Sequence, residues 1–494
     1  MKRWKVSSKP RSIAPFAVFD CKRRYRETNR NIGFPHDERA NGMSALDKYL
    51  KQCNEVYHTT LDPCKFGCVR IHLVPPRKVE FGTPWSVILN GYHVLPIQTS
   101  WAILLKEFIE CLNKTDGQSL TDADVIKLVN EVVDNVQKLF KKAKETDIRS
   151  DLLDIVDTLK AVAYGEEPPV EIGHLTLAEY SDCMKAPHRV DLLVSAMEKD
   201  HVWNCNQHCL HCYACGERLA SAVELPTVDW FTIIDKLKKA CVPSVTFTGG
   251  EPTMRRDLVE LVDHARWFVT RLNTNGILLS KELCKKLYAA SLDSVQITFY
   301  SSDKEIHNKL VGGDHFDATV EGIQNALEAG LDVSVNTPLC SVNQDYAETL
   351  HFLKRLGVHY FSCSGLIPSG NALRGPSSIT RLSQEEITAV VRKAWQYCTE
   401  HELELSFTSP GWITEHELLR MKMVVPSCGA CLSNMAVAPN GQLIPCQSWL
   451  HEDGLGNLLE REFEDLWDSE RCVARRRETV VAAKTCPLSK EARP

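Results

Sequence analysis

Three cysteines with close, regular spacing form a group that suits metal binding. Cys205, Cys209 and Cys212 are separated by three residues and then by two, within the stretch CNQHCLHCYACGERL. A cubane iron–sulfur cluster has four irons and is usually held by four thiolates. Three thiolates would leave one iron open to a small molecule that binds through an amine and a carboxylate. The alternatives are a structural zinc site, which usually combines CxxC pairs into four ligands, and chance clustering in a cysteine-rich chain.

A glycine-rich turn further along the chain suits ligand binding. It consists of Gly249, Gly250, Glu251 and Pro252. Glycines let the backbone approach a ligand closely, and a glutamate pairs with an ammonium group. The cysteine spacing, followed by Tyr213, and this turn together resemble the radical SAM superfamily. The resemblance implies a [4Fe-4S] cluster on the three cysteines and S-adenosylmethionine (SAM) on the open iron, beside Tyr213 and the glycine-rich turn.

Strand-like and helical stretches alternate between residue 189 and about residue 410. The expected strands are 189–197, 245–248, 269–275, 294–299, 332–338 and 360–366, and the expected helices are 229–240, 257–266, 280–290, 317–329 and 346–356. Repeated strand–helix units form a parallel sheet, and six of them predict an α/β fold with a partial (β/α)6 barrel. Active sites of such barrels lie at the C-terminal ends of the strands. The cysteine loop follows the first strand and the glycine-rich turn follows the second.

Polar residues near the ends of later strands are further candidates. Asn275 ends the third strand, Gln296 and Thr298 share a face of the fourth, Asn336 lies on the fifth, and Ile367 follows the sixth. The family resemblance implies that such positions contact the ribose, carboxylate or adenine of SAM. The alternative is that their amides and hydroxyls only complete hydrogen bonds at the mouth of the barrel.

Two cysteines near strand ends are candidates for catalysis. Cys340 and Cys363 follow or end the fifth and sixth strands, where a thiol could donate a hydrogen atom to a substrate radical. The alternative is that each is a small buried apolar residue. Cys215 has the same two interpretations, and no ligand of the family occupies its position.

A second cysteine group lies near the C-terminal end. Cys428, Cys431 and Cys446 occur in CGACLSNMAVAPNGQLIPC, where Asn-Gly predicts a hairpin. The spacing from Cys431 through Gly441 to Cys446 resembles the twitch and SPASM extensions of the family. The resemblance implies one auxiliary [4Fe-4S] cluster on Cys428, Cys431, Cys446 and Cys486, with Cys472 or no residue as the alternative fourth ligand. A structural zinc site is the other alternative.

Two departures from the family pattern are visible in this region. A full SPASM domain has a further cysteine-dense run for a second auxiliary cluster, whereas only Cys472 and Cys486 remain here. Sulfatase-maturing relatives have an aspartate as base directly after the hairpin cysteine, and this chain has Gln447. Neutral glutamine accepts no proton at ordinary pH, so that particular oxidation is not expected.

The part of the chain before the barrel has strand-like runs first and helical patterns after them. Strand-like runs occur at 69–74, 78–81 and 85–89, and Asn90-Gly91 predicts a hairpin after the last of them. Helical patterns follow at 99–112, 121–130 and 132–142. The order resembles the winged-helix-like element that binds leader peptides at a sheet edge; a structural cap is the alternative. The expected divisions are an irregular segment 1–68, an α+β domain 69–150, a linker 151–188, the barrel 189–410 and an auxiliary domain 411–494.

The irregular first segment contains a loose group of metal-ligand residues. Cys53, His58, Cys64 and Cys68 lie close together, but their spacing matches no metal-site pattern. A metal site and unrelated thiols therefore stay open as alternatives.

Composition excludes several classes. The 494 residues carry a net charge of −6 without a basic block, which argues against nucleic-acid binding. No stretch approaches the roughly 20 apolar residues of a membrane-spanning helix, and the first residues lack the apolar core of a signal peptide. Twenty cysteines without an export signal indicate thiols and metal ligands in a reducing cytosol.

The resemblance implies an oxidoreductase that cleaves SAM reductively to a 5′-deoxyadenosyl radical, using an external electron donor of the flavodoxin or ferredoxin type. The radical would take a hydrogen atom from a ribosomally made peptide or a protein side chain, in an oxidation, cross-linking or epimerisation. The leader of such a peptide would bind the N-terminal α+β domain. A small molecule, such as a porphyrin, an aminoglycoside or a cofactor precursor, is the alternative substrate. A non-catalytic scaffold is a third reading, for which an intact SAM-binding turn would have no purpose.

Overall fold

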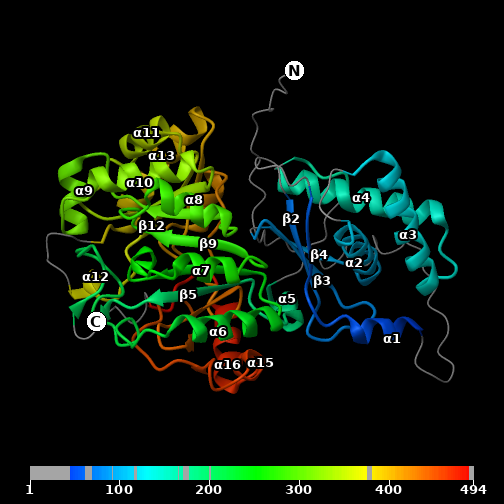
Figure 1. The fold of residues 1–494 in the computed structure, drawn as a ribbon. Coiled ribbons are helices and arrows are strands. Elements are labelled where there is room, and N and C mark those ends of the chain that lie inside the picture. Colours follow the sequence, from blue (N-terminus) through cyan, green and yellow to red (C-terminus); the bar gives the residue numbers. More distant parts are fainter. Residues whose placement is uncertain are drawn as a thin grey trace. The chain divides into compact units, whose positions relative to one another are not determined.

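The computed structural model divides into two compact units after Lys185. It describes residues 45–61, 69–91, 93–115, 120–164, 166–170, 177–199, 202–374 and 381–488. The two units are shown in Figure 1, and each is described by itself.

An antiparallel four-stranded sheet forms the centre of the first unit. Its strands are β1 Tyr57–Leu61, β2 Val69–Val74, β3 Trp85–Leu89 and β4 His93–Ile97, in the order β1-β2-β3-β4. The β3–β4 hairpin is confirmed: Asn90 and Gly91 have φ of 50° and 69°, the left-handed values that such a turn requires. The strand expected at 78–81 is absent, because these residues form a loop and turn before β3.

Helices cover this sheet and complete its core. They are α1 Ala45–Gln52, α2 Thr99–Asn113, α3 Asp122–Leu139, α4 Glu145–Ala163 and α5 Leu177–Cys183. The helices expected at 121–130 and 132–142 are one helix, α3, which begins with a capping box between Thr121 and Asp124. Residues 151–163, expected to belong to a linker, are the second part of α4. Leu152 and Leu159 of α4 lie in the same buried cluster as Ile71 of β2.

Seven parallel strands form the main sheet of the second unit. They are β5 Arg189–Ser195, β8 Ser244–Gly249, β9 Val269–Thr274, β10 Ser294–Thr298, β11 Asp332–Leu339, β12 Tyr360–Gly365 and β13 Glu404–Phe407. The six strands expected from the sequence are confirmed, and β13 is an additional one. Chain order equals spatial order along this part of the sheet, so the strand ends that carry the motifs are neighbours.

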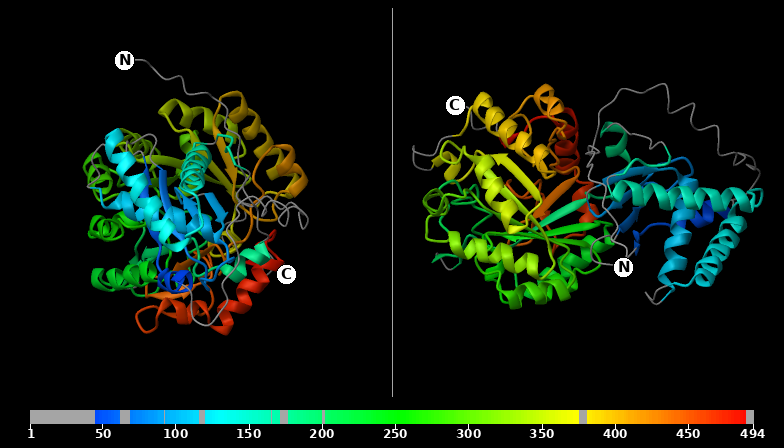
Figure 2. Two further views of the ribbon diagram at one scale, coloured as in Figure 1. Left: turned by 90° about the vertical axis from the view of Figure 1, so that its right-hand side faces the viewer. Right: turned by 90° about the horizontal axis from the view of Figure 1, so that it is seen from above.

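Helices surround these strands, as Figure 2 shows. The helices of this unit are α6 Thr227–Lys239, α7 Leu258–His264, α8 Lys281–Ala289, α9 Lys304–Val311, α10 Phe316–Glu328, α11 Tyr346–Leu356, α12 Asn371–Arg374, α13 Gln384–Glu400, α14 Glu415–Arg420, α15 Phe463–Trp467 and α16 Glu470–Val481. Two of these helices have clear caps: Ser280 accepts from the backbone of Leu283 to begin α8, and Gly357 ends α11 in the left-handed conformation. The fold is therefore a partial (β/α) barrel.

The C-terminal region extends the same sheet. Strand β14 Asn434–Val437 pairs in parallel with β5, placing Ala436 opposite Asp191. Strand β15 Gln442–Ile444 returns antiparallel, and β16 Gly456–Asn457 completes the edge. Gly441, with φ of 84°, makes the expected turn between β14 and β15. The auxiliary cysteines on either side of this hairpin are thereby fixed beside the first barrel strand.

Candidate active site

The three cysteines of the first motif lie in the loop that follows β5. After Ser195 the chain forms a small hairpin, β6 Glu198–Lys199 and β7 Val202–Trp203, and then enters the cysteine loop. Burial raises the pKa of Cys205 to about 12, and the pKa of Cys209 lies well above its usual range because of burial and the neighbouring thiols. A thiolate without a neighbouring positive charge is unfavourable here. The positive charge of bound iron would stabilise the thiolate form.

The donor set fits an iron–sulfur cluster better than a single ion. The Cys205 and Cys212 thiols raise the pKa of Cys209, and the Cys212 thiol raises the pKa of Cys205. Among the residues that the structure describes, no three His, Cys, Asp or Glu side chains converge on a single metal ion. The thiolates of a cubane bind separate irons and stand further apart than the ligands of one ion.

Helix α9 holds one side of the cysteine loop. The backbone amides of His208 and Leu210 donate to the carbonyls of Val311 and Leu310, each at 3.0 Å. A Cβ at Gly312 would stand 2.4 Å from the carbonyl oxygen of His208, so only glycine fits this contact. Helix α9 was not expected from the sequence.

The segment after β12 holds the other side of the loop. The backbone amide of Asn371 donates to the carbonyl of Cys212 at 2.8 Å, and that of Gly370 donates to the Glu217 carboxylate at 2.9 Å. Arg374 also bonds Glu217, at 3.1 Å. The cysteine loop is thus fixed by segments that follow the fourth and sixth barrel strands.

The glycine-rich turn lies directly against the end of β5. The amide of Gly250 donates to the carbonyl of Ser195 at 2.7 Å. A Cβ would stand 2.3 Å from that oxygen at Gly249 and 2.9 Å from the carbonyl oxygen of Ala196 at Gly250. Both positions therefore require glycine, and the turn begins beside the strand that leads to the cysteine loop.

Glu251 is buried, and its carboxylate is bonded within the chain. Its Oε1 accepts from the amide and hydroxyl of Thr253, at 3.0 and 2.5 Å, and from the hydroxyl of Thr274 at 2.7 Å. Its Oε2 accepts from the amide of Asn275 at 2.8 Å. Burial raises the pKa of the Glu251 carboxyl, although these bonds act in the opposite direction. The carboxylate thereby joins the second and third strand ends.

Asn275 carries this connection into the cysteine loop. Its side-chain amide donates to the side-chain oxygen of Asn206 at 2.6 Å. Asn206 directly follows Cys205, so the glycine-rich turn, the end of β9 and the first cysteine form one bonded assembly. The sequence placed Asn275 at the site but gave no indication of Asn206.

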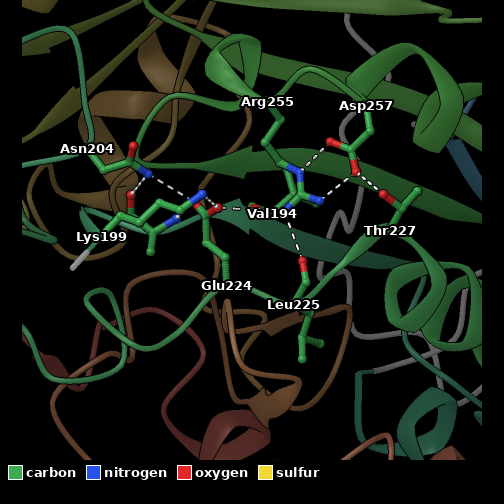
Figure 3. A network of polar contacts seen from close by, with 9 residues as sticks. Val194, Lys199, Asn204, Glu224, Leu225, Thr227, Arg255 and Asp257 are labelled. Atoms are coloured by element: carbon green, nitrogen blue, oxygen red, sulfur yellow. Dashed lines mark hydrogen bonds and ion pairs between the residues drawn. The ribbon is translucent and has the colours of Figure 1, made fainter.

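A second polar network braces the two ends of the β5–Cys205 connection. One carboxylate oxygen of Glu224 accepts from the amide of Ala196 and from the side chain of Asn204, each at 2.9 Å. Arg255 donates to the carbonyl of Val194 at 2.8 Å and makes a two-nitrogen contact with Asp257. Figure 3 shows Arg255 and Asp257, from the segment after the glycine-rich turn, near Glu224, Asn204 and the Val194 backbone of β5. These contacts should hold the backbone between the end of β5 and Cys205 in one position.

The remaining polar candidates share one face of adjoining strands. Thr298 of β10 lies opposite Asn336 of β11, which in turn lies opposite Ser362 of β12. The Ser362 hydroxyl donates to the side-chain oxygen of Asn336 at 2.9 Å, and Gln296 reaches Ser362 at 3.5 Å. The structure brings these residues together and adds Ser362, which sequence reasoning missed although it alternates with Cys363.

The two candidate hydrogen donors differ in their placement. Cys340 is buried in an apolar cluster with Tyr300 and Leu366, and Cys209 packs against that cluster. Cys363 is buried too; Cys398 of α13 raises the pKa of its thiol, and Cys363 in turn raises the pKa of Tyr346 of α11. Strand alternation therefore points Cys363 to the helical layer, away from the face of Ser362. This placement argues against Cys363 as a hydrogen donor to substrate.

The C-terminal group contains five thiols. Burial raises the pKa of Cys446 to about 12, and the nearby Cys428 and Cys486 thiols contribute to this. Cys431 lies beside Cys472, and the Cys446 thiol also influences its charge. The structure thus brings together the four expected ligands, and it adds Cys472 next to one of them.

The loose group near the start is only partly described. Cys53 lies in the core of the first unit, where its thiol faces the carbonyl of Tyr49 at 3.4 Å. His58 stacks on His72 with ring centroids 5.7 Å apart. Cys64 and Cys68 lie outside the described residues.

Comparisons with known proteins agree with this geometry. Residues 201–365 match the model of the radical SAM superfamily, and residues 428–487 match that of the SPASM iron-sulfur cluster-binding domain. A protein of Methanosarcina barkeri named Fe-coproporphyrin III synthase is 38% identical over 294 residues, which cover 54% of this chain and 72% of that protein. The chain belongs to the radical SAM superfamily. As in that family, its cofactors are SAM with a [4Fe-4S] cluster and an auxiliary iron–sulfur cluster.

Two further matches to this radical SAM enzyme are a curated relative and a solved structure. A probable GTP 3′,8-cyclase of Saccharolobus islandicus is 34% identical over 172 residues, 34% of this chain and about half (55%) of that protein. The chain also resembles the crystal structure of SuiB from Streptococcus suis with S-adenosylmethionine. The match covers 83% of this chain and 94% of the SuiB chain, with a TM-score of 0.57 and 14% identity. That likeness shows the fold. Among the helices in the described ranges, none is long and apolar enough to cross a membrane.

The residues present fit these cofactors. Cys205, Cys209 and Cys212 would hold the SAM-binding cluster, and the glycine-rich turn would accept the amino group of SAM. When bound, the pair supplies a deoxyadenosyl radical that takes a hydrogen atom from the substrate. The chain contributes the positioning, because Glu251 and Asn275 fix the turn to the cysteine loop.

Proposed function

We propose that this radical SAM enzyme modifies a side chain of a ribosomally made peptide or protein by hydrogen abstraction. The observation that carries the proposal is the first unit, in which β2–β4 precede α2, α3 and α4. A meander followed by three helices is the order of elements that bind leader peptides by adding a strand to the sheet. The SuiB fold, which covers most of this chain, has also been determined with the precursor peptide SuiA.

The open edge that such a peptide would use is β4. It pairs with β3 on one side and is the last strand of its sheet. Pro96 lies within β4, and proline is tolerated on an edge strand when its nitrogen faces the open side. Val94, two residues earlier, has the same orientation, so its N–H points to the open edge. Val94 is therefore the donor that an added strand would bond.

A pair of variants at Val94 tests leader binding. Val94→Pro removes the edge N–H without removing a β3–β4 bond, whereas Val94→Ala keeps that N–H and shortens the side chain. With a fluorescently labelled precursor peptide encoded beside the gene, anisotropy should show about tenfold weaker binding for Val94→Pro, equivalent to about 1.4 kcal/mol. Binding by Val94→Ala should stay within about twofold of the unaltered protein. Equal binding by all three proteins would rule out this edge.

The catalytic half of the proposal is tested with the reconstituted enzyme. The protein is loaded anaerobically with iron and sulfide and mixed with SAM, a reduced flavodoxin and the precursor peptide. Mass spectrometry should find 5′-deoxyadenosine and a peptide that has lost hydrogens or changed stereochemistry. Cys205→Ala should abolish 5′-deoxyadenosine formation, and Cys446→Ala should retain SAM cleavage while losing product. Equal SAM cleavage by Cys205→Ala would contradict the assigned roles.

A tetrapyrrole substrate is the second candidate function. The observation in its favour is the 38% identity to the Fe-coproporphyrin III synthase over 294 residues, whereas the identity to SuiB is 14%. The discriminating experiment offers the reconstituted enzyme either the precursor peptide or an iron porphyrin. SAM turnover that rises only with the porphyrin would favour the second candidate, and turnover that rises only with the peptide would favour the first.

A further inference from the structure

The auxiliary site has one thiol more than a cubane requires. Four of its thiols, Cys428, Cys431, Cys446 and Cys486, influence one another directly or through Cys446. The fifth, Cys472, is fully buried on α16, and its side chain hydrogen-bonds with that of Cys431. A cubane usually takes four thiolates. With four other thiols present, Cys472, which is hydrogen-bonded to Cys431, is open to a different role.

A buried arginine one helical turn later contacts both of these cysteines. Arg476 donates from Nε to the carbonyl of Cys431 at 2.9 Å and from a terminal nitrogen to the Cys472 sulfur at 3.6 Å. The same nitrogen donates to the carbonyl of Trp467 at 2.8 Å, and the guanidinium lies over the Trp467 ring at 3.4 Å from its centroid. These contacts leave the guanidinium one orientation.

The same helix and the residues directly after it are anchored to the turn that carries the first two ligands. The Thr479 hydroxyl donates to the carbonyl of Ala430 at 2.8 Å, and the amide of Cys428 donates to the carbonyl of Ala483. Arg476 is 7% exposed. Its charge is therefore held at a fixed place beside the ligand turn, where solvent screens it little.

A buried cluster with four thiolate ligands carries net negative charge, and each added electron makes it more negative. Positive charge and hydrogen bonds at the ligand sulfurs favour the reduced form. We infer that Arg476, acting through Cys472 and the Cys431 backbone, is a positioning residue that raises the reduction potential of the auxiliary cluster. Cys472 is then the hydrogen-bonded support of Cys431 and not an iron ligand.

The chain contains a matched control for this inference. Arg477 is the next residue of α16 and is exposed. Arg477→Gln removes the same charge from the same helix without touching the cysteines, whereas Arg476→Gln removes the buried charge. Both variants are reconstituted anaerobically and reduced with dithionite to a series of fixed potentials. Electron paramagnetic resonance then measures the reduced fraction of the auxiliary cluster at each potential. The auxiliary signal is the one that added SAM does not alter.

Arg476→Gln should change the oxidised-to-reduced ratio of the auxiliary cluster at fixed potential at least tenfold towards the oxidised form, which is 59 mV for one electron. Arg477→Gln should change it less than about twofold. Cys472→Ala should keep the auxiliary iron, whereas Cys486→Ala should lose it. An unshifted Arg476→Gln, or loss of auxiliary iron from Cys472→Ala, would overturn the inference.

If Arg476→Gln binds no auxiliary iron, Arg476→Lys shows whether Arg476 acts through its charge or only supports folding. Lysine keeps the positive charge but cannot bond to both Cys431 and Cys472 as the guanidinium does. An oxidised-to-reduced ratio within about threefold of that of the unaltered protein supports the inference. A lysine variant that also lacks the cluster would show that Arg476 serves folding alone and would overturn it. A protein without any SAM-sensitive signal would instead count against the proposed function, while the auxiliary signal would still report on Arg476.

Discussion

The amide of Gly250 donates to the carbonyl of Ser195 at 2.7 Å, and this bond joins the ends of the first two barrel strands. Gly249 precedes it with φ of 139°, a value that side chains rarely adopt. A β-carbon at Gly249 would also stand 2.3 Å from the same Ser195 oxygen. The glycine-rich turn and the entry to the cysteine loop therefore cannot shift independently.

Gly249→Ala should separate this turn from β5. The backbone strain alone costs about 1–3 kcal/mol, and the collision with Ser195 must displace the turn. We expect a lower unfolding temperature and the loss of the change that SAM makes in the cluster's electron paramagnetic resonance spectrum. Gly357→Ala is the matched control, because φ there is 99° and the nearest atom to an added Cβ is a Leu327 side-chain carbon at 3.7 Å. A control as defective in SAM binding as Gly249→Ala would contradict this account.

Glu224 should govern how firmly the cysteine loop is held. Glu224→Ala leaves the buried amide of Ala196 without its acceptor, which costs about 1–3 kcal/mol. The loop should then lose SAM-cluster iron to a chelator several times faster. Glu224→Gln keeps an oxygen acceptor and should retain most of the iron.

The control for this prediction is a carboxylate in the same loop. Glu198, in the small hairpin before Cys205, is partly exposed. Iron loss from Glu198→Ala should match that of the unaltered protein. Equal rates for Glu224→Ala and Glu198→Ala would show that the network in Figure 3 does not brace the loop.

His307 should make the protein sensitive to acid. This histidine is fully buried behind Tyr300, and burial, followed by the nearby His315, lowers the pKa of its ring to about 4. The folded state therefore favours the neutral ring. The stability that this provides is complete above pH 6.5, and it is lost as the pH falls towards 4, by roughly 3 kcal/mol in total.

His307→Gln tests this contribution, because glutamine accepts the bond from the Tyr300 amide and does not titrate in this range. The measurement is urea denaturation under anaerobic conditions at several pH values. The difference between the two proteins should shrink as the pH falls from 7 to 4.5, since the cluster's own acid sensitivity is common to both. A constant difference would show that His307 does not ionise on unfolding.

The sequence predicted the barrel well because its signals are local. Short buried runs such as Val245–Phe247 and the glycines after α10 and α11 define strands and helix ends without tertiary information. The cluster and SAM motifs are also contiguous, so their place after the first two strands followed from chain order. The membership of α4 in the first unit depends on packing against Ile71, which the sequence alone does not give.

The parts that were missed depend on contacts between distant residues. Helix α9 had readable signals, with Asp303 capping its start and Gly312 ending it, but nothing local showed that it bonds the cysteine loop. Cys472 carries no motif, and only the packing of α16 places it beside Cys431. Cys363 was assigned by its proximity to a strand end, whereas its role depends on which strand face it occupies.

Cys363 therefore offers a test of the strand-face argument. Its thiol lies towards α11 and α13, so Cys363→Ala should remove only buried volume and cost about 1 kcal/mol of stability. SAM cleavage and product yield should stay within about twofold. Ser362→Ala, one residue earlier on the opposite face, removes the bond to Asn336 and should raise the concentration of SAM needed for half-maximal cleavage. Product lost with SAM cleavage retained in Cys363→Ala would instead identify that thiol as the hydrogen donor and refute the assigned face.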